Sequence, residues 1–215
     1  MAIQTQGTTG NVMEVDTTFK AARMSVRPQE VLGWNSIGSQ TGNLTGLAAL
    51  APIFAFRNLG ANPIVVRRIG LAVIIGTGFT AAQFVDYGLM IARSWTATDT
   101  GGTAIAVTGS NCKHRTSLAT PTSVDCRIAT TVALTAGTRT LDSNNISQLG
   151  GIALASTLSA VVPNSLNNLL QHDTGEYPLV LAQNEGLIVQ SITAMGAGGI
   201  LKALVNMEFA EAVSY

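Results

Sequence analysis

The chain of 215 residues carries very little charge. It has 12 basic and 12 acidic side chains, so that 11% of its residues are charged, whereas an ordinary soluble domain has about 25%. The zero net charge provides no long-range attraction to nucleic acid or to an anionic membrane. The longest apolar runs, 47–56 and 69–75, are far shorter than the ~20 residues of a membrane-spanning helix. We therefore expect no nucleic-acid partner, no membrane partner and a surface that other protein largely covers in the working state.

The first half of the chain is predicted to be an arm followed by strands. Residues 1–16 are rich in Thr, Gln and Gly and lack periodicity, so we expect an extended N-terminal arm. Residues 33–46 are polar and Gly-rich, which predicts a long connection. The segment 64–75 alternates at period two except at Arg67. Apolar or alternating segments predict strands at residues 17–26, 47–57, 64–75 and 83–95.

The second half continues this pattern with more irregular stretches. A polar loop is expected at 109–124, and residues 135–151 and 156–178 are predicted to be irregular, with one or two helical turns at 165–170. Strands are predicted at residues 103–108 and 126–134. Because no segment has the apolar period of a long helix, the fold class is predicted to be all-β, a jelly-roll-like antiparallel β-sandwich that residues 17–215 form as one domain.

The C-terminal part has the clearest strand pattern. An apolar segment at 178–182 leads through the turn 184–186 into a second segment at 187–192, and the Gly-rich loop 194–199 follows. One face of the last strand is apolar, with Leu201, Ala203, Val205, Met207 and Phe209. This alternation is typical of a half-buried strand. We expect two long antiparallel strands joined by the Gly-rich loop, with a shorter strand that enters through the turn.

Few side chains suggest chemistry. Cys112 and Cys126 lie fourteen residues apart without a CxxC pair. We expect two free thiols or a fortuitous pair, and a disulfide between them is the alternative. His114 and His172 are the only histidines, too few for a multi-histidine metal site within one chain. No serine lies in a GxSxG turn, and no acidic pair has a strong local spacing. We therefore expect no enzymatic activity, no catalytic residue, no cofactor and no metal.

Charged and aromatic side chains supply the candidate interface residues. Asp86 lies in the middle of a predicted strand, where a buried carboxylate needs a partner. We expect it to pair with Arg67 or Arg68; the alternative is that one of these arginines faces a neighbouring subunit. Arg and the large aromatic side chains are favoured at interfaces. The interface candidates are Trp34, Arg67, Arg68, Arg115 and Tyr215.

Two blocks of the sequence resemble virion proteins of tailed bacteriophages. Residues 177–212 resemble the closing strands of phage jelly-roll proteins, and a second block runs from Arg115 to Ser117 and from Arg127 to Asp142. Together they cover about a third of the chain, and the loop at 142–176 has no counterpart. The resemblance implies a jelly roll that occurs as a trimer on a capsid lattice or as part of a fibre or collar.

The leading hypothesis is therefore a non-enzymatic capsid decoration or cement protein. Its expected partners are copies of itself in a homotrimer and the major capsid protein or other virion proteins, with the capsid surface of the virion as its location. The N-terminal arm would add a strand to a neighbour's sheet edge. The alternative is a fibre, collar or baseplate module that recognises a host or attaches a tail. The loops at 109–124 and 142–176 contain no Trp, which counts against glycan recognition.

Overall fold

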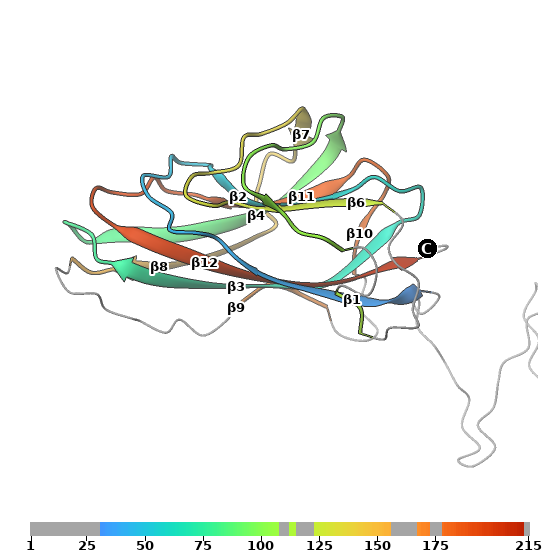
Figure 1. Ribbon diagram of the computed structural model, residues 1–215, viewed down its shortest axis with the longest axis horizontal. Coiled ribbons are helices and arrows are strands. Elements are labelled where there is room, and N and C mark those ends of the chain that lie inside the picture. The colour runs from blue at the N-terminus through green and yellow to red at the C-terminus, as the bar shows by residue number, and fades with distance from the viewer. Residues whose placement is uncertain (1–30, 108–111, 115–122, 156–166, 173–177, 213–215) are drawn as a thin grey trace, which may run out of the picture.

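The chain folds into two antiparallel β-sheets packed face to face (Figure 1). The computed structural model describes residues 31–107, 112–114, 123–155, 167–172 and 178–212, and these ranges contain strands and no helix. The strands are β1 (Val31–Gln40), β2 (Pro52–Asn58), β3 (Ile64–Thr77), β4 (Gln83–Trp95), β5 (Thr103–Ala104), β6 (Val124–Ile128), β7 (Arg139–Leu141), β8 (Ser147–Ala153), β9 (Asn167–Gln171), β10 (Leu179–Leu181), β11 (Gly186–Ser191) and β12 (Ile200–Ala212). The predicted all-β class is confirmed.

The strands alternate between the sheets in the order of a jelly roll. One sheet has five strands in the order β1-β12-β3-β10, with β9 also paired to β3. The other has seven strands in the order β5-β6-β2-β11-β4-β7, with β8 also paired to β4. The chain crosses between the sheets at each step from β1 to β4, stays in the seven-stranded sheet from β4 to β8, and crosses again before β9, β11 and β12. The first and last described strands are neighbours. The predicted jelly-roll-like sandwich is confirmed.

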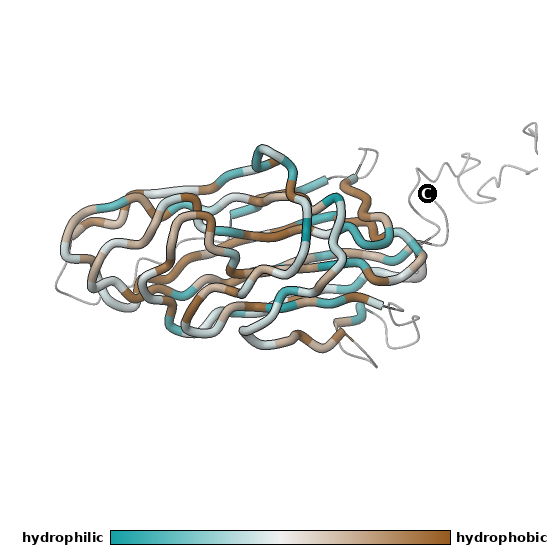
Figure 2. The backbone as a smooth tube through the Cα atoms, turned by 90° about the horizontal axis from the view of Figure 1, so that it is seen from above, coloured by the Kyte–Doolittle hydropathy of each residue, from teal (hydrophilic) through white to brown (hydrophobic). Residues whose placement is uncertain are grey.

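The core lies between the two sheets and consists of aliphatic and aromatic side chains. Figure 2 shows hydrophobic segments running through the strands. β2 and β11 are buried along their whole length, because each has a strand on both sides and the other sheet over its inner face. Phe56 of β2 meets Phe209 of β12 edge to face, with ring centroids 4.9 Å apart, so this pair joins the sheets at the centre of the core.

The expected connection at 33–46 is wrong in its first part, because β1 extends to Gln40. β1 pairs with β12, with Asn35 opposite Phe209 and Ile37 opposite Met207. Ile37 is buried while Ser36 and Gly38 are exposed. A strand at the edge of a sheet tolerates polar and Gly residues on its solvent side, and this composition made the segment look like a loop.

In three further places the structure has a strand where none was predicted. The stretch predicted as irregular at 135–151 contains β7 and most of β8, and the residues predicted as helical turns form β9. These strands lie at sheet margins, where pairing with β4 or β3 supplies the order that their sequences do not encode. β5 and β6 are shorter than predicted, ending at Ala104 and Ile128.

The expected antiparallel pair at the C-terminus is also wrong. β11 lies in the seven-stranded sheet between β2 and β4, whereas β12 lies in the five-stranded sheet between β1 and β3. The Gly-rich residues 192–199 thus cross from one sheet to the other. β3 and β4 also lie in different sheets. Asp86 of β4 is therefore not paired with Arg67 or Arg68 of β3. Asp86 instead accepts hydrogen bonds from the backbone N–H and the hydroxyl of Thr193, at 2.8 and 2.9 Å.

A β-bulge explains why Arg67 interrupts the alternation of its strand. Arg68 pairs with Glu208 and Val66 pairs with Phe209, so that Arg67 has no residue of β12 opposite it. An extra residue of this kind shifts the phase of the strand by one. Val66 and Ile69 both face the core, and the two arginines between them are exposed or half-exposed. The bulge therefore brings two consecutive positive charges to the outer face.

Candidate interaction surface

Trp34, Arg67, His114 and Glu208 form a cluster on the outer face of the five-stranded sheet. The guanidinium carbon of Arg67 lies 5.6 Å from the centroid of a Trp34 ring, and its Nη1 lies 3.4 Å from Oε1 of Glu208. Nε2 of His114 lies 4.0 Å from the same carboxylate oxygen and 2.6 Å from the Ser36 hydroxyl. We call these four residues the Trp34 cluster. The structure thus brings together two of the predicted interface residues, Trp34 and Arg67.

Residues 112–114, which include His114 of the Trp34 cluster, pair with the edge of β1. The N–H of Ser36 donates to the carbonyl of Cys112 at 2.7 Å, and the N–H of His114 donates to the carbonyl of Trp34 at 3.1 Å. Residues 112–114 therefore act as a short partner for β1. Because the Arg67–Glu208 pair is half-exposed, water screens it and it adds at most ~1 kcal/mol to stability.

The other predicted interface residues lie elsewhere. Arg68 follows the bulge, and its Nε donates to the side-chain oxygen of Asn168 in β9 at 2.8 Å, so this arginine holds the margin of its own sheet. Arg115 and Tyr215 lie outside the described residues, as do the predicted arm at 1–16 and the predicted strand at 17–26. Their roles at an interface stay predictions.

Three large apolar side chains are exposed on the outer side of β4 and β8. Phe84 is 63% exposed, Ile152 65% and Leu154 75%. Phe84 and Ile152 are directly opposite each other in the pairing of the two strands. With Ile192 they border a shallow groove of about 310 Å³. We call Phe84, Ile152 and Leu154 the apolar patch; contiguous exposed apolar side chains of this kind mark interaction sites.

β8, which carries part of the apolar patch, is a sheet edge. Among the strands that the structure describes, it pairs only with β4, from Gln83–Ala153 to Leu89–Ser147. Its sequence, Ser147–Ala153, contains no charged residue and no proline. Charged side chains, prolines and bulges are the usual means of preventing an edge strand from pairing with another chain. The β8 edge has none of them, and no other strand among the described residues pairs with its second side.

A buried charged pair supports the opposite end of β4. Asp99 and Arg139 form a salt bridge in which the carboxylate is fully buried and the arginine nearly so. Asp99 also accepts the N–H of Gly137 at 2.8 Å. The Arg139 guanidinium lies 5.0 Å from the centroid of a ring of Trp95. The Trp95 side chain is completely buried. The pair fixes β7 and the loop after β4, and it lies too deep to contact a partner.

The cysteines and histidines form no reactive site in the described part of the chain. Cys112 and Cys126 are both free thiols, as predicted, and burial raises the pKa of each. No group of three or more His, Cys, Asp or Glu side chains is placed to hold a metal ion among the described residues. Within the same residues no helix is long and apolar enough to span a membrane.

The chain has no match among family models, curated proteins or solved structures. The fold therefore defines its class as an all-β protein with two antiparallel sheets in a jelly-roll order. No related protein suggests a function, so the proposal for this chain rests on the residues of its own surface.

Sequence reasoning did not find the apolar patch or the β8 edge. The stretch 135–151 was predicted to be irregular, and this concealed a strand that begins with Ser147 and Gln148 and ends with Ile152 and Ala153. One signal was available in the sequence. The signal is a period of two that persists through the glycine pair. One set of alternate positions holds Leu149, Gly151 and Ala153, and the positions between them hold Gln148, Gly150 and Ile152.

Proposed function

We propose that the chain is a non-enzymatic structural subunit of a large protein assembly, of the phage virion type that its sequence resembles. The observation that carries the proposal is the β8 edge, an uncharged strand with one free side next to the apolar patch. An edge with these properties favours pairing with a strand of another chain. The low charge of the whole chain supports the same conclusion, because a protein that works alone needs a more charged surface.

Within this proposal the chain decorates and stabilises a capsid. Its partners are copies of itself, in a homotrimer, and the major capsid protein. A protein that binds only the assembled shell shifts the equilibrium towards that shell. Each contact gains about 25 cal/mol for every Å² of apolar surface that it buries, and simultaneous contacts at several sites multiply the effect. No bond is made or broken, and no cofactor takes part.

Quantitative mass spectrometry of purified virions of the phage that encodes the chain tests this role. A capsid decoration protein is expected at a copy number comparable with that of the major capsid protein. Recovery at only a handful of copies per particle would contradict lattice decoration and favour the alternative of a fibre, collar or baseplate module. Absence of the chain from the particles would contradict both.

A further inference from the structure

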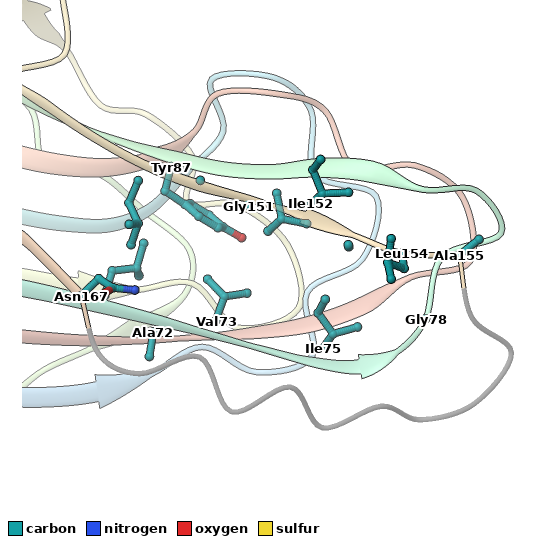
Figure 3. Close-up of a pocket in the computed structure, with 15 residues that line it drawn as sticks. Ala72, Val73, Ile75, Gly78, Tyr87, Gly151, Ile152, Leu154, Ala155 and Asn167 are labelled. Carbon is teal, nitrogen blue, oxygen red and sulfur yellow. The ribbon is translucent and has the colours of Figure 1, made fainter.

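A cavity of about 570 Å³ lies between the two sheets beneath β8. Leu71, Val73 and Ile75 of β3 form one wall, and Val85 and Tyr87 of β4 lie on the opposite side, with the inner face of β8. Its volume is in the range of small-molecule binding sites, which are largely apolar with a few polar groups. The cavity opens towards the exposed Leu154 (Figure 3).

The cavity exists because β8 presents small residues to the core. Gly151 pairs with Val85 and lines the cavity, where it is exposed, and the buried Ala153 follows two positions later. A Cβ atom added to Gly151 would meet no atom within 4 Å, so the space next to it is empty. Protein interiors are otherwise close-packed, and an opening of this size at a strand of small residues is unusual.

Two of the described residues that line the cavity have polar side chains, Tyr87 and Asn167. Tyr87 is only 2% exposed, and Figure 3 shows its ring between the sheets with the hydroxyl directed to the space between Gly151 and Val73. Within the part of the chain that the structure describes, no group forms a hydrogen bond with this hydroxyl. A ligand that supplies a partner for this hydroxyl would gain both apolar contact and a hydrogen bond.

The charges around the cavity restrict the charge that a ligand can carry. None of the described residues that line it is charged. The nearest carboxylate, that of Asp86, acts electrostatically on Tyr87 from the adjacent position. A carboxylate ligand would therefore be buried without a counter-ion and beside a like charge.

We propose that this cavity binds a neutral aliphatic molecule with a single hydrogen-bonding end, such as a long-chain alcohol, ketone or ester, and that the Tyr87 hydroxyl binds that end. The aliphatic part lies along Leu71, Val73 and Gly151 and leaves the sandwich near Leu154. This proposal does not rest on the proposed structural role, although Ile152 and Leu154 belong both to the apolar patch and to the lining of the cavity.

Calorimetric titration of the full chain with 1-decanol, and with decanoate at pH 8, tests the proposal. We expect saturable one-to-one binding of decanol and at least about tenfold weaker binding of decanoate, because the charged end has no counter-ion. Tyr87→Phe keeps the volume and removes the hydroxyl, and it should weaken decanol binding about fivefold to tenfold. Gly151→Val fills the cavity and should weaken decanol binding by more than about tenfold.

Gly76→Val provides the matched control. Gly76 lies on β3, is exposed, and would place a Cβ atom in ordinary contact 3.7 Å from the carbonyl of Ile200, so this variant should bind decanol like the wild type. Thermal unfolding of each variant identifies any that does not fold. Absence of saturable decanol binding by the wild type would overturn the proposal, and so would a folded Gly151→Val variant that binds with wild-type affinity.

Discussion

At the scale of single residues, the salt bridge between Asp99 and Arg139 has the strongest predicted effect on stability. Asp99→Asn should lower the free energy of unfolding by about 3–5 kcal/mol, because it leaves a buried arginine without its counter-ion. Asp142→Asn is the matched control. It breaks the exposed pair with Arg93 and should cost less than about 1 kcal/mol. Urea unfolding measures both; equal effects would contradict the distinction between buried and exposed pairs.

Two buried groups predict that the protein loses stability in alkaline solution. Burial raises the pKa of the Cys126 thiol well above its ordinary value of about 9.0, and burial together with the charge of Asp86 raises the pKa of Tyr87 above its ordinary 10.0. The folded state therefore keeps protons that the unfolded state releases. Their contribution to stability is complete below about pH 9 and is lost as the pH rises towards the folded-state values.

The measurement is the free energy of unfolding between pH 7.5 and 10.5. It should fall above about pH 9, and the fall should be shallower in Cys126→Ala. A wild-type stability that does not change over this range, or an identical pH dependence in the variant, would show that these groups do not control it.

At the scale of elements, the sequence predicts strands well where burial gives a strong pattern and poorly where pairing alone creates order. The predicted strand at 83–95 coincides with β4, which has neighbours on both sides. β1, β8 and β9 escaped prediction because polar and Gly residues on sheet margins resemble loops. Of the candidate site, Trp34 and Arg67 were predicted individually. Their contact depends on a bulge and on the pairing of β12 with both β1 and β3, which no local pattern encodes.

The β8 edge makes a prediction at the same scale. Ile152→Lys places a charge on the exposed side of the edge strand and should prevent association between chains, because a charge opposes strand addition. It should change the free energy of unfolding by no more than about 0.5 kcal/mol, since the side chain is exposed.

Sedimentation velocity over a range of concentrations measures the association. The control, Thr140→Lys, adds the same charge at an exposed position of β7, which also pairs with β4, and should associate like the wild type. If both variants associate like the wild type, β8 is not the assembly edge.

At the scale of the whole molecule, the proposed structural role accounts for the shortage of charge, because it places part of the surface against other protein. The two sheets bury an extensive apolar core, yet the apolar patch and the uncharged β8 edge remain open to solvent in one chain. Their exposure is unfavourable for an isolated protein and is relieved when copies or other subunits cover them. By contrast, residues 112–114 of the same chain pair with the edge of β1, so the two edges differ in their readiness to associate.

The molar mass of the purified chain in solution, measured by light scattering across a range of concentrations, tests this account most directly. We predict a stable trimer with three times the mass of one chain. A mass of a single chain at every concentration would contradict the assembly role, because the apolar patch and the β8 edge would then remain exposed in the soluble protein.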